Sequence, residues 1–479
     1  MATTGQTGPR VGAYTRRRML QLGVGTVALP LLSACGGGAT ASSSMQAATT
    51  AAGTTGSAAT AAATTGSAAT VASSSAAAGK PAALQFWYAW SVSDAPMKYY
   101  QNLANTSWAA KHPGSSLKIV SVPDSQQEAK FTAAFAAGQG PDLFTDMVDI
   151  YTQRGISTPL PADLAKTLQD NLIPASVLNY EYNNQFRAVP FIPIGSLGLV
   201  LFYNADHFTQ AGLDPAKPPA TMTDLWAYAQ KLVQVDSGGN VTRSGFAENI
   251  QPDPGAMAGK FLPFLHAAGG LLYDPKTVKA TGFVNSTGGV DALQMLHDMS
   301  IGAKKVSSVT LGLAEEQMAR GQASMIFRES SFVGYFKTNA PKLNLKISQV
   351  PKEKQEGCGA FGLNWSLMAN KASPSLPATF DFMRDIATAQ VDLDVAKAAQ
   401  TIPAWKSSWQ DPYMNSRPDY AALQYTSTHD PGIRYLAPNT TQAEQAYGKL
   451  LLAVMRGEQA PKAAADAAAG QIDQIMHPS

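Results

Sequence analysis

The chain changes character near Pro81, and this change decides which part of it can fold into a compact domain. From Gly36 to Gly79 the residues are almost all Gly, Ala, Ser and Thr, and the stretch 54–60 is repeated from Thr64 to Thr70. Such a segment has few side chains large enough to bury, so hydrophobic gain cannot offset the entropy of ordering it. We therefore predict a flexible tether over residues 36–80 and a folded region that begins after it.

A basic and then apolar segment precedes the tether. Arg16, Arg17 and Arg18 are followed by a mostly apolar run from Met19 to Ala34, which is shorter than the roughly 20 residues that a transmembrane helix needs. Basic residues, a short apolar run and small residues together are typical of an export signal. The paired arginines resemble the twin-arginine pattern, although an ordinary Sec-type signal would also contain them.

The residues Leu32-Ser33-Ala34-Cys35 resemble the bacterial lipobox, in which the cysteine receives a diacylglycerol group. We therefore interpret residues 1–35 as a lipoprotein export signal that ends at Cys35. The lipid on Cys35 would hold the remaining chain at the outer face of the bacterial cell membrane. An uncleaved anchor helix is the alternative, and it places the chain on the same side.

Charge and cysteine content exclude some classes of partner. The precursor has a formal charge of +2, and removal of Arg10, Arg16, Arg17 and Arg18 leaves 32 basic against 34 acidic residues, a charge of −2. Nucleic acid is therefore not an expected partner. The chain has two cysteines, and a lipid on Cys35 leaves Cys358 with no partner for an intrachain disulfide.

Strand-like and helix-like segments alternate in the folded region, which favours an α/β architecture. The residues 83–90 and 117–122 have the composition of strands, and Met97 to His112 between them has that of a helix that ends at Pro113-Gly114. Ser125 and Glu128 form a capping box before the next helix, and a short strand follows Pro141. The length from Pro81 to Ser479 is sufficient for two lobes.

These segments resemble a known family. Residues 131–144, which read FTAAFAAGQGPDLF, are similar to the early signature of the family 1 extracellular solute-binding proteins, the sugar-type receptors of ABC importers. Further landmarks of that family follow in its order, and the resemblance covers Leu84 to Met476. They lie at residues 201–208, 211–215, 218–221, 223–233, 268–272, 292–296, 318–325, 364–369 and 401–404.

The resemblance implies a periplasmic-binding-protein-like fold, in which two α/β lobes are joined by a hinge and close on a ligand in the cleft between them. Each lobe uses discontinuous sequence. We expect lobe one to comprise residues 84–196 and 346–402, and lobe two to comprise residues 197–345 and 403–479. The resemblance also implies a monomer that binds a small molecule without a cofactor or metal and delivers it to the transmembrane subunits of an ABC permease.

Candidate ligand residues in the first half of the chain follow two predicted strands. Sugar recognition needs flat apolar faces for the ring and polar groups for its hydroxyls. Trp87 and Trp90 end the first strand, where strand alternation sends them to opposite faces. Asp146 and Asp149 lie in the loop after Pro141 in which the family places ligand contacts. The alternatives are core packing for the tryptophans and helix capping for the aspartates.

The second half of the chain supplies the other candidates. Arg328 and Glu329 follow the predicted strand at Met325, and an ion pair between them is the alternative to ligand contact. Asn364 and Trp365 open the returning strand, and Trp365 is the preferred candidate for stacking on a sugar ring. Three more loosely aligned candidates complete the set, namely Gln251, Asp253 and Trp405.

Enzymatic motifs are not found in the sequence. The six histidines are scattered without a His-Glu-x-x-His pair, Gly195-Ser196-Leu197-Gly198 lacks the first glycine of a nucleophile elbow, and Gly255 to Phe261 does not satisfy the P-loop pattern. We therefore predict a non-enzymatic lipoprotein that captures a small solute, expected to be a sugar or oligosaccharide, for an ABC importer. Two alternatives stay open: a secreted lipoprotein that hydrolyses glycans, and a non-catalytic surface adhesion protein.

Overall fold

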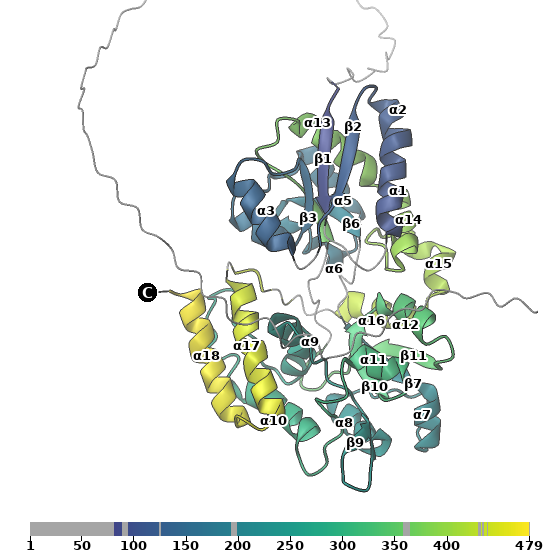
Figure 1. Cartoon of the computed structure of the whole chain (residues 1–479), viewed down its shortest axis with the longest axis vertical. Helices are drawn as coiled ribbons and strands as arrows, with labels where there is room; N and C mark the ends of the chain where they lie inside the picture. Colours follow the sequence, from purple (N-terminus) through teal and green to yellow (C-terminus); the bar gives the residue numbers. More distant parts are fainter. Residues whose placement is uncertain are drawn as a thin grey trace, which may run out of the picture. The chain divides into compact units, whose positions relative to one another are not determined.

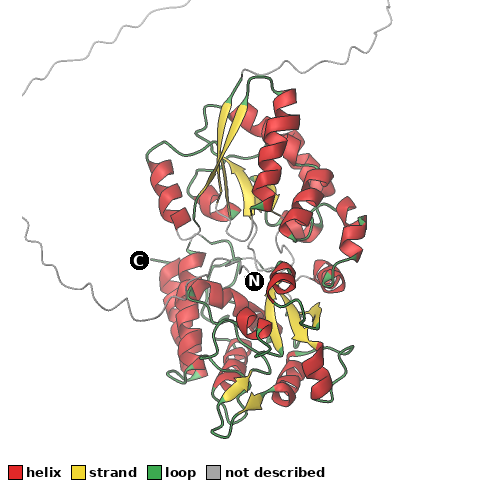
Figure 2. Cartoon of the chain, turned by 45° about the vertical axis from the view of Figure 1, so that its right-hand side comes forward, coloured by secondary structure: helices red, strands yellow, loops and turns green. Residues whose placement is uncertain are grey.

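The computed structural model describes residues 81–88, 94–123, 126–192, 199–357, 365–429, 433, 435–437 and 439–478. The predicted signal with Cys35, the tether and Cys358 lie outside these ranges. In the part of the chain that the structure describes, no helix has both the length and the apolar character that crossing a membrane requires. Most of the described strands lie in two larger sheets, each with its own helices, and the remaining strands form two two-stranded pairs (Figures 1 and 2).

The first sheet has five strands in the order β2-β1-β3-β12-β6. Strands β1 and β2 pair in parallel, β1 also pairs in parallel with β3, and β12 runs antiparallel between β3 and β6. This order confirms the predicted strands at 83–90, at 117–122 and after Pro141, and it joins the chain's early and late segments. The strands are β1 (Ala83–Tyr88), β2 (Ser116–Ser121), β3 (Leu143–Asp146), β6 (Ala188–Ile192) and β12 (Trp365–Ala369).

Helices flank this sheet to form lobe one (Figure 1). The predicted helix from Met97 to His112 is present from Ala95 to Lys111 with one π-helical turn inside it, at Ala104–Trp108. A small hairpin, β4 (Glu181–Tyr182) and β5 (Gln185–Phe186), precedes β6. The helices are α1 (Ala95–Leu103), α2 (Ala109–Lys111), α3 (Gln127–Ala136), α4 (Val148–Gln153), α5 (Ala162–Asn171), α6 (Pro174–Val177), α13 (Leu376–Ile386) and α14 (Ala389–Ala399).

The core of lobe one is rich in aromatic side chains. Tyr100 stacks on Phe191 with ring centroids 4.8 Å apart, and its hydroxyl donates to the backbone oxygen of Phe191. Trp108 is fully buried and meets the ring of Phe382 edge to face at 5.7 Å. These contacts fasten the α1–α2 helical region to β6 and to α13, so residues far apart in sequence share one core.

The second sheet has the order β10-β7-β11, and both outer strands run antiparallel to the central β7. Every residue of β7 is buried, because cores cover both of its faces. Leu199, Leu201 and Tyr203 face one core, whereas Val200 and Phe202 face the other. The strands are β7 (Leu199–Asn204), β10 (Met325–Glu329) and β11 (Leu345–Gln349), with a separate pair β8 (Gln234–Val235) and β9 (Val241–Arg243).

Helices on both faces of this sheet complete lobe two. The predicted helix from Thr223 to Val233 is α8, which begins one residue earlier because Thr221 is its N-cap and forms a capping box with Asp224. The helices are α7 (Ala205–Gln210), α8 (Met222–Leu232), α9 (Pro254–Ala267), α10 (Thr287–Ser300), α11 (Ala314–Ala319), α12 (Phe332–Asn339), α15 (Pro412–Asn415), α16 (Tyr420–His429), α17 (Thr440–Met455) and α18 (Pro461–Met476).

The structure moves the expected lobe boundary at residue 346. Strand β11 pairs with β7 along its whole length, so residues 345–349 belong to lobe two. The following residues stay there as well, because Lys352 exchanges backbone hydrogen bonds with Ala220 and Met222. The prediction that lobe one resumes at 346 is therefore wrong, and the chain returns to the first sheet only at Trp365.

The boundary expected at residue 403 also moves. Ala404 and Trp405 pack in the core of lobe one, and their backbone N–H groups donate to the buried carboxylate of Asp392 at 3.1 and 3.0 Å. The backbone of Lys406 donates to Asn171 of lobe one. Residues 404–406 therefore belong with lobe one, and the crossing to lobe two follows them.

Arg417 stabilises the crossing to lobe two that follows residues 404–406. The guanidinium of Arg417 makes a bidentate ion pair with Asp419, at 2.9 and 2.6 Å, and both side chains are buried. It also donates to the backbone oxygens of Gln400 and Thr401 at 3.0 Å, next to the left-handed conformation of Gln400, with a φ of 56°. The residues at the end of α14 are thereby tied to the segment that leads into α16.

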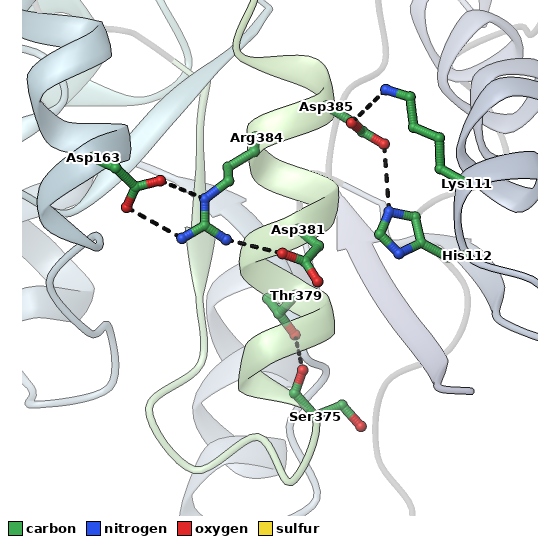
Figure 3. Close-up of polar contacts among 8 residues, drawn as sticks. All are labelled: Lys111, His112, Asp163, Ser375, Thr379, Asp381, Arg384 and Asp385. Atoms are coloured by element: carbon green, nitrogen blue, oxygen red, sulfur yellow. Dashed lines mark hydrogen bonds and ion pairs between the residues drawn. The ribbon is translucent and has the colours of Figure 1, made fainter. Parts of the chain in front are cut away.

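Helix α13 is also held by charged contacts at the surface of lobe one (Figure 3). Arg384 makes a bidentate contact with Asp163 of α5, at 2.7 and 3.2 Å, and reaches Asp381 at 2.9 Å. On the other side, Asp385 accepts from Lys111 at 2.7 Å and lies 3.7 Å from His112. These solvent-exposed pairs orient the helix, but its apolar face supplies the larger stabilisation.

Two substitutions on contacts of α13 should distinguish the stabilisation that comes from apolar burial from the stabilisation that comes from the surface ion pairs. Trp108→Ala removes a fully buried ring whose Nε1 has no hydrogen-bond partner, so we expect a loss of about 3–5 kcal/mol in unfolding free energy. Arg384→Ala should cost at most about 1 kcal/mol. Urea denaturation of both variants beside the parent protein measures the loss in unfolding free energy. Equal losses in the two variants would contradict the conclusion that apolar burial stabilises α13 more than its ion pairs do.

Candidate functional site

Strand alternation at the end of β10 sends its two charged residues to opposite faces of the second sheet. Arg328 lies on the face of Ile326, where its guanidinium is 3.7 Å from the ring centroid of Phe332 and 3.7 Å from a carboxylate oxygen of Glu315. Its side chain is 8% exposed. Arg328 and Glu329, both predicted ligand contacts, also lie 3.4 Å apart, in the ion pair that the sequence left open as an alternative.

Glu329 pairs with Lys260 of α9 on the other face. The Nζ of Lys260 donates to Oε1 of Glu329, and both side chains are largely buried. Burial raises the pKa of Glu329, but the charges of Lys260 and then Arg328 outweigh it and lower the pKa to about 2. Burial lowers the pKa of Lys260, and Glu329 acts in the opposite direction. The four charges of Lys260, Glu329, Arg328 and Glu315 therefore form one compensated buried network.

The loop before α9 carries two further predicted residues. Asp253 is the N-cap of α9 and accepts from the backbone of Gly255 at 3.1 Å and from the side chain of Gln445 on α17. Gln251 is partly buried, and its Nε2 has no hydrogen-bond partner in the described part of the chain. In the same loop, Asn249 donates to the backbone oxygen of Phe327 on β10. The loop is thus fixed to both β10 and α17.

Carboxyl groups from both lobes influence one another electrostatically near this loop. Asp149 lies in the first turn of α4 in lobe one, and Glu444 lies near the start of α17 in lobe two. Burial, followed by the charges of Asp149 and Asp253, raises the pKa of Glu444 to about 8, with Lys260 acting in the opposite direction. Burial also raises the pKa of Asp149.

The segment before α17 is anchored by tyrosines and contacts lobe one. Tyr435 accepts from the backbone of Leu272 at 2.9 Å, and Tyr273 makes a 2.6 Å hydrogen bond to Thr440. Between them, the backbone oxygen of Leu436 accepts from Gln153 of α4 at 2.6 Å. This hydrogen bond joins the two lobes beside Asp149 and Glu444. We refer to Asp149, Gln251, Asp253 and Glu444 as the cleft cluster.

Two other candidates of lobe one, Asp146 and Trp87, make their contacts with residues outside the cleft cluster. Asp146 ends β3 and accepts from Gln127 at 2.8 Å and from the backbone of Met147 at 2.7 Å. Trp87 is half-buried against Phe131, with Lys130 5.3 Å from its ring. These contacts account for Trp87 as packing, as the sequence alternative suggested.

Trp405 is corrected by the structure. Its side chain is 4% exposed and packs in the core of lobe one, while its backbone forms a bridge with Leu172. A ring buried in this way has no face to offer a ligand, so the prediction of ligand contact is wrong. Trp90, Asn364 and the side chain of Trp365 lie outside the described residues.

Sequence reasoning missed two residues, Lys260 and Glu444, that take part in these contacts. Lys260 is the single charged residue other than His266 in the otherwise apolar helix α9. A lone lysine in such a helix is a usable signal, because a buried ammonium requires an acidic partner. Glu444 carries no comparable signal, because it lies among the polar residues in the first half of α17.

A third missed residue, Glu248, lines a small cavity beneath the Lys260–Glu329 pair. The cavity has a volume of about 20 Å³, enough for about one water molecule, and its other walls are mainly apolar side chains such as Phe246, Phe261 and Leu451. Ser300 donates to one oxygen of Glu248 at 3.2 Å, and the other oxygen has no hydrogen-bond partner among the residues that the structure describes. Burial raises the pKa of Glu248 to about 8, so at neutral pH this carboxyl is largely protonated.

Comparison with known proteins identifies the family to which the chain belongs. Residues 104–422 match the family described as bacterial extracellular solute-binding protein. The chain belongs to this family. The resemblance predicted from sequence is confirmed, and with it an extracytoplasmic protein of the two-lobed α/β fold. Among the described residues of this solute-binding protein, no group of three or more His, Cys, Asp or Glu side chains is placed to hold a metal ion.

Solved structures of similar fold cover most of the solute-binding protein. The GacH receptor of Streptomyces glaucescens, solved unliganded and with acarbose, is 20% identical, with a TM-score of 0.67 over 83% of this chain and 99% of the receptor. A substrate-binding protein of Listeria monocytogenes in complex with cycloalternan is 18% identical, with a TM-score of 0.66 over 83% and 99%. The cyclic alpha-maltosyl-1,6-maltose binding protein of Arthrobacter globiformis is 18% identical, with a TM-score of 0.67 over the same shares.

A short segment also matches a curated relative. The sn-glycerol-3-phosphate-binding periplasmic protein UgpB of Escherichia coli is 55% identical over 40 residues. This match covers 8% of the solute-binding protein and 9% of the length of UgpB.

The Lys260–Glu329 pair generates a stability prediction. Lys260→Met leaves the buried Glu329 with Arg328 as its remaining cationic neighbour, and we expect a loss of about 3 kcal/mol in unfolding free energy. The double variant with Glu329→Leu should recover part of this loss. Urea denaturation at pH 7 measures both, and Lys166→Met, which removes an exposed pair with Asp170, is the matched control with little expected change.

Glu248 generates a pH prediction. Its folded-state pKa of about 8 lies above the ordinary 4.5, so the folded protein retains a proton that the unfolded chain releases. The contribution of Glu248 to stability is therefore complete below pH 4.5 and is lost as the pH rises to 8, on the order of 1.4 kcal/mol per pH unit. Glu248→Gln should remove this dependence. Unfolding free energies at pH 5, 7 and 9 test it, and parallel profiles for the two proteins would contradict it.

Proposed function

We propose that this solute-binding protein is the receptor of an ABC importer, that its ligand is a carbohydrate, and that it delivers this ligand to a membrane permease. It binds without catalysing a reaction. The observation that carries the proposal is the cleft cluster, in which carboxyl groups of both lobes and an unpaired amide gather near the hydrogen bond between Gln153 and Leu436. Carboxyl oxygens accept from sugar hydroxyls, and the Nε2 of Gln251 can donate to a hydroxyl oxygen.

The similar structures support a carbohydrate over other solutes. The GacH receptor was solved with acarbose and the Listeria protein with cycloalternan, and the Arthrobacter protein is named for binding cyclic alpha-maltosyl-1,6-maltose. The short match to UgpB favours a second candidate, sn-glycerol 3-phosphate. A phosphate would add negative charge beside Asp149, Asp253 and Glu444, where burial and then the charges of the two aspartates already raise the pKa of Glu444. We therefore favour a neutral polyhydroxyl ligand.

We also propose how the receptor is held at the membrane. Cys35 carries a diacylglycerol group after export by the signal at 1–35, by the Tat or the Sec route, and residues 36–80 act as the tether of a monomeric receptor. A flexible tether raises the effective concentration of the receptor at the permease, and this concentration falls as the tether lengthens. Conversion of Cys35 to Ser should release the receptor from membranes, as cell fractionation would measure.

Calorimetric titration of the full chain tests the ligand class. Acarbose, maltotetraose and cycloalternan are titrated beside sn-glycerol 3-phosphate at pH 7. We expect saturable 1:1 binding of at least one carbohydrate and about tenfold or greater weakening by Asp149→Asn or Glu444→Gln, because each replaces one carboxyl oxygen by an amide nitrogen that cannot accept from a ligand hydroxyl. Asp214→Asn, at an exposed aspartate of lobe two, is the matched control and should bind as the parent does.

The outcomes distinguish the candidates. Binding of sn-glycerol 3-phosphate without binding of any carbohydrate would overturn the carbohydrate assignment and leave the importer receptor in place. Release of hydrolysed sugar during the titration would overturn the non-catalytic role. A carbohydrate that binds both cleft variants and the parent equally would remove the cleft cluster from the ligand site.

A further inference from the structure

Lobe two contains a second pocket, on the side of α8 and α10. It has a volume of about 380 Å³, within the range of roughly 300–1,000 Å³ that is usual for small-molecule sites. No residue of the cleft cluster lines it, and neither do Lys260, Arg328 or Glu329. Its floor is apolar and consists of Met222, Trp226, Phe264, Ala268, Ala292 and Met295.

Hydrogen bonds hold the elements around the pocket in place, and two of its apolar side chains remain partly exposed. Helix α8 begins at Met222, where the capping box of Thr221 and Asp224 fixes its first turn. The segment after β11 forms a wall of the pocket beside α8 and α10. It is held there because the backbone N–H of Lys354 donates to the backbone oxygen of Ala267 at the end of α9. Trp226 and Met295 pack against the core on one side and remain partly exposed on the other.

The rim of the pocket is acidic. Asp291 forms an ion pair with Lys354 at 2.8 Å, and Asp298 accepts from Gln294 and His297 at 2.9 Å. Glu353 accepts from the backbone and the hydroxyl of Thr223, each at 3.0 Å. These contacts hold the three carboxylates in place, and each carboxylate has acceptor capacity beyond them. Lys354 is the one lysine among the lining residues.

We propose that this pocket is a second ligand site, separate from the cleft, for a small amphipathic cation with a compact apolar body and a protonated amine. The apolar body covers Trp226 and Met295, and the ammonium lies at the rim where Asp291, Asp298 and Glu353 outnumber Lys354. A neutral polyhydroxyl compound fits this pocket less well, because its hydroxyl groups would lose water over an apolar floor. An anion is disfavoured by the rim charge.

The aromatic floor adds a specific preference. The indole of Trp226 offers a π face to the apolar body, and an ammonium near its ring gains a further cation–π attraction. Met222 and Met295 are unbranched and polarizable, so they adapt to the outline of an aromatic ligand. Tryptamine combines these properties in one molecule and serves as the probe.

Calorimetric titration of the full chain with tryptamine tests the proposal. We expect saturable 1:1 binding, and we expect the double variant Asp291→Asn/Asp298→Asn to weaken it about tenfold, because it removes two of the three rim charges. Indole-3-ethanol has nearly the same shape without the charge and should bind about tenfold more weakly than tryptamine. Asp214→Asn is the matched control and should leave tryptamine binding unchanged.

Two arms locate the site. Glu444→Gln and Asp149→Asn should bind tryptamine as the parent does, whereas loss of binding in them would mean that the amine occupies the cleft and would overturn the proposal. The double rim variant should retain the carbohydrate affinity of the parent, which also shows that it is folded. Equal binding of indole-3-ethanol, an unchanged affinity in the rim variant, or no saturable binding of tryptamine would each overturn the proposal.

Discussion

The buried ion pair of Lys260 and Glu329 is the contact on which the ligand side of lobe two depends. It joins α9 to the end of β10, and the loop before α9 carries Gln251 and Asp253. A buried pair of this kind stabilises little beyond an apolar equivalent, but it fixes register, because neither partner tolerates loss of the other. The loop before α9 therefore has a defined position relative to the end of β10.

The same constraint explains the chemistry around it. Arg328 and Glu315 add a second pair, so the network is neutral as a whole and supplies no net charge to a ligand. The polar capacity that remains lies in the cleft cluster, where burial, followed by the charges of Asp149 across the lobes and of Asp253, raises the pKa of Glu444. Ligand hydroxyls that donate to these carboxyls would offset the repulsion, which makes closure of the lobes more favourable with a ligand than without one.

How much of this could be predicted from sequence differs between levels of structure. The strands β1, β2 and β3, the helical region from α1 to α2 and the capped helix α8 follow from local patterns, so their prediction succeeded within a few residues. The boundary at 346 failed because the pairing of β11 with β7 joins residues far apart in sequence, and local patterns do not say which sheet a segment joins. Trp405 failed for a related reason: its burial depends on Asp392 and Leu172, which are close in space only after lobe one has folded. Lys260 carried a signal, whereas Glu444 acquires its character from Asp149 across the lobes.

The chain crossing after residues 404–406, which Arg417 stabilises, indicates how the lobes can move. Arg417 is buried and donates to Asp419, to the hydroxyl of Tyr413 and to the backbone oxygens of Gln400 and Thr401. Motion that separated these groups would leave a guanidinium without acceptors in a buried position, at a cost of several kcal/mol, on the order of that for breaking a buried ion pair. Closure must therefore keep this cluster together. Rotation of the lobes is then confined to dihedral changes in chain segments on either side of it, as in hinge motions that concentrate movement at a few residues.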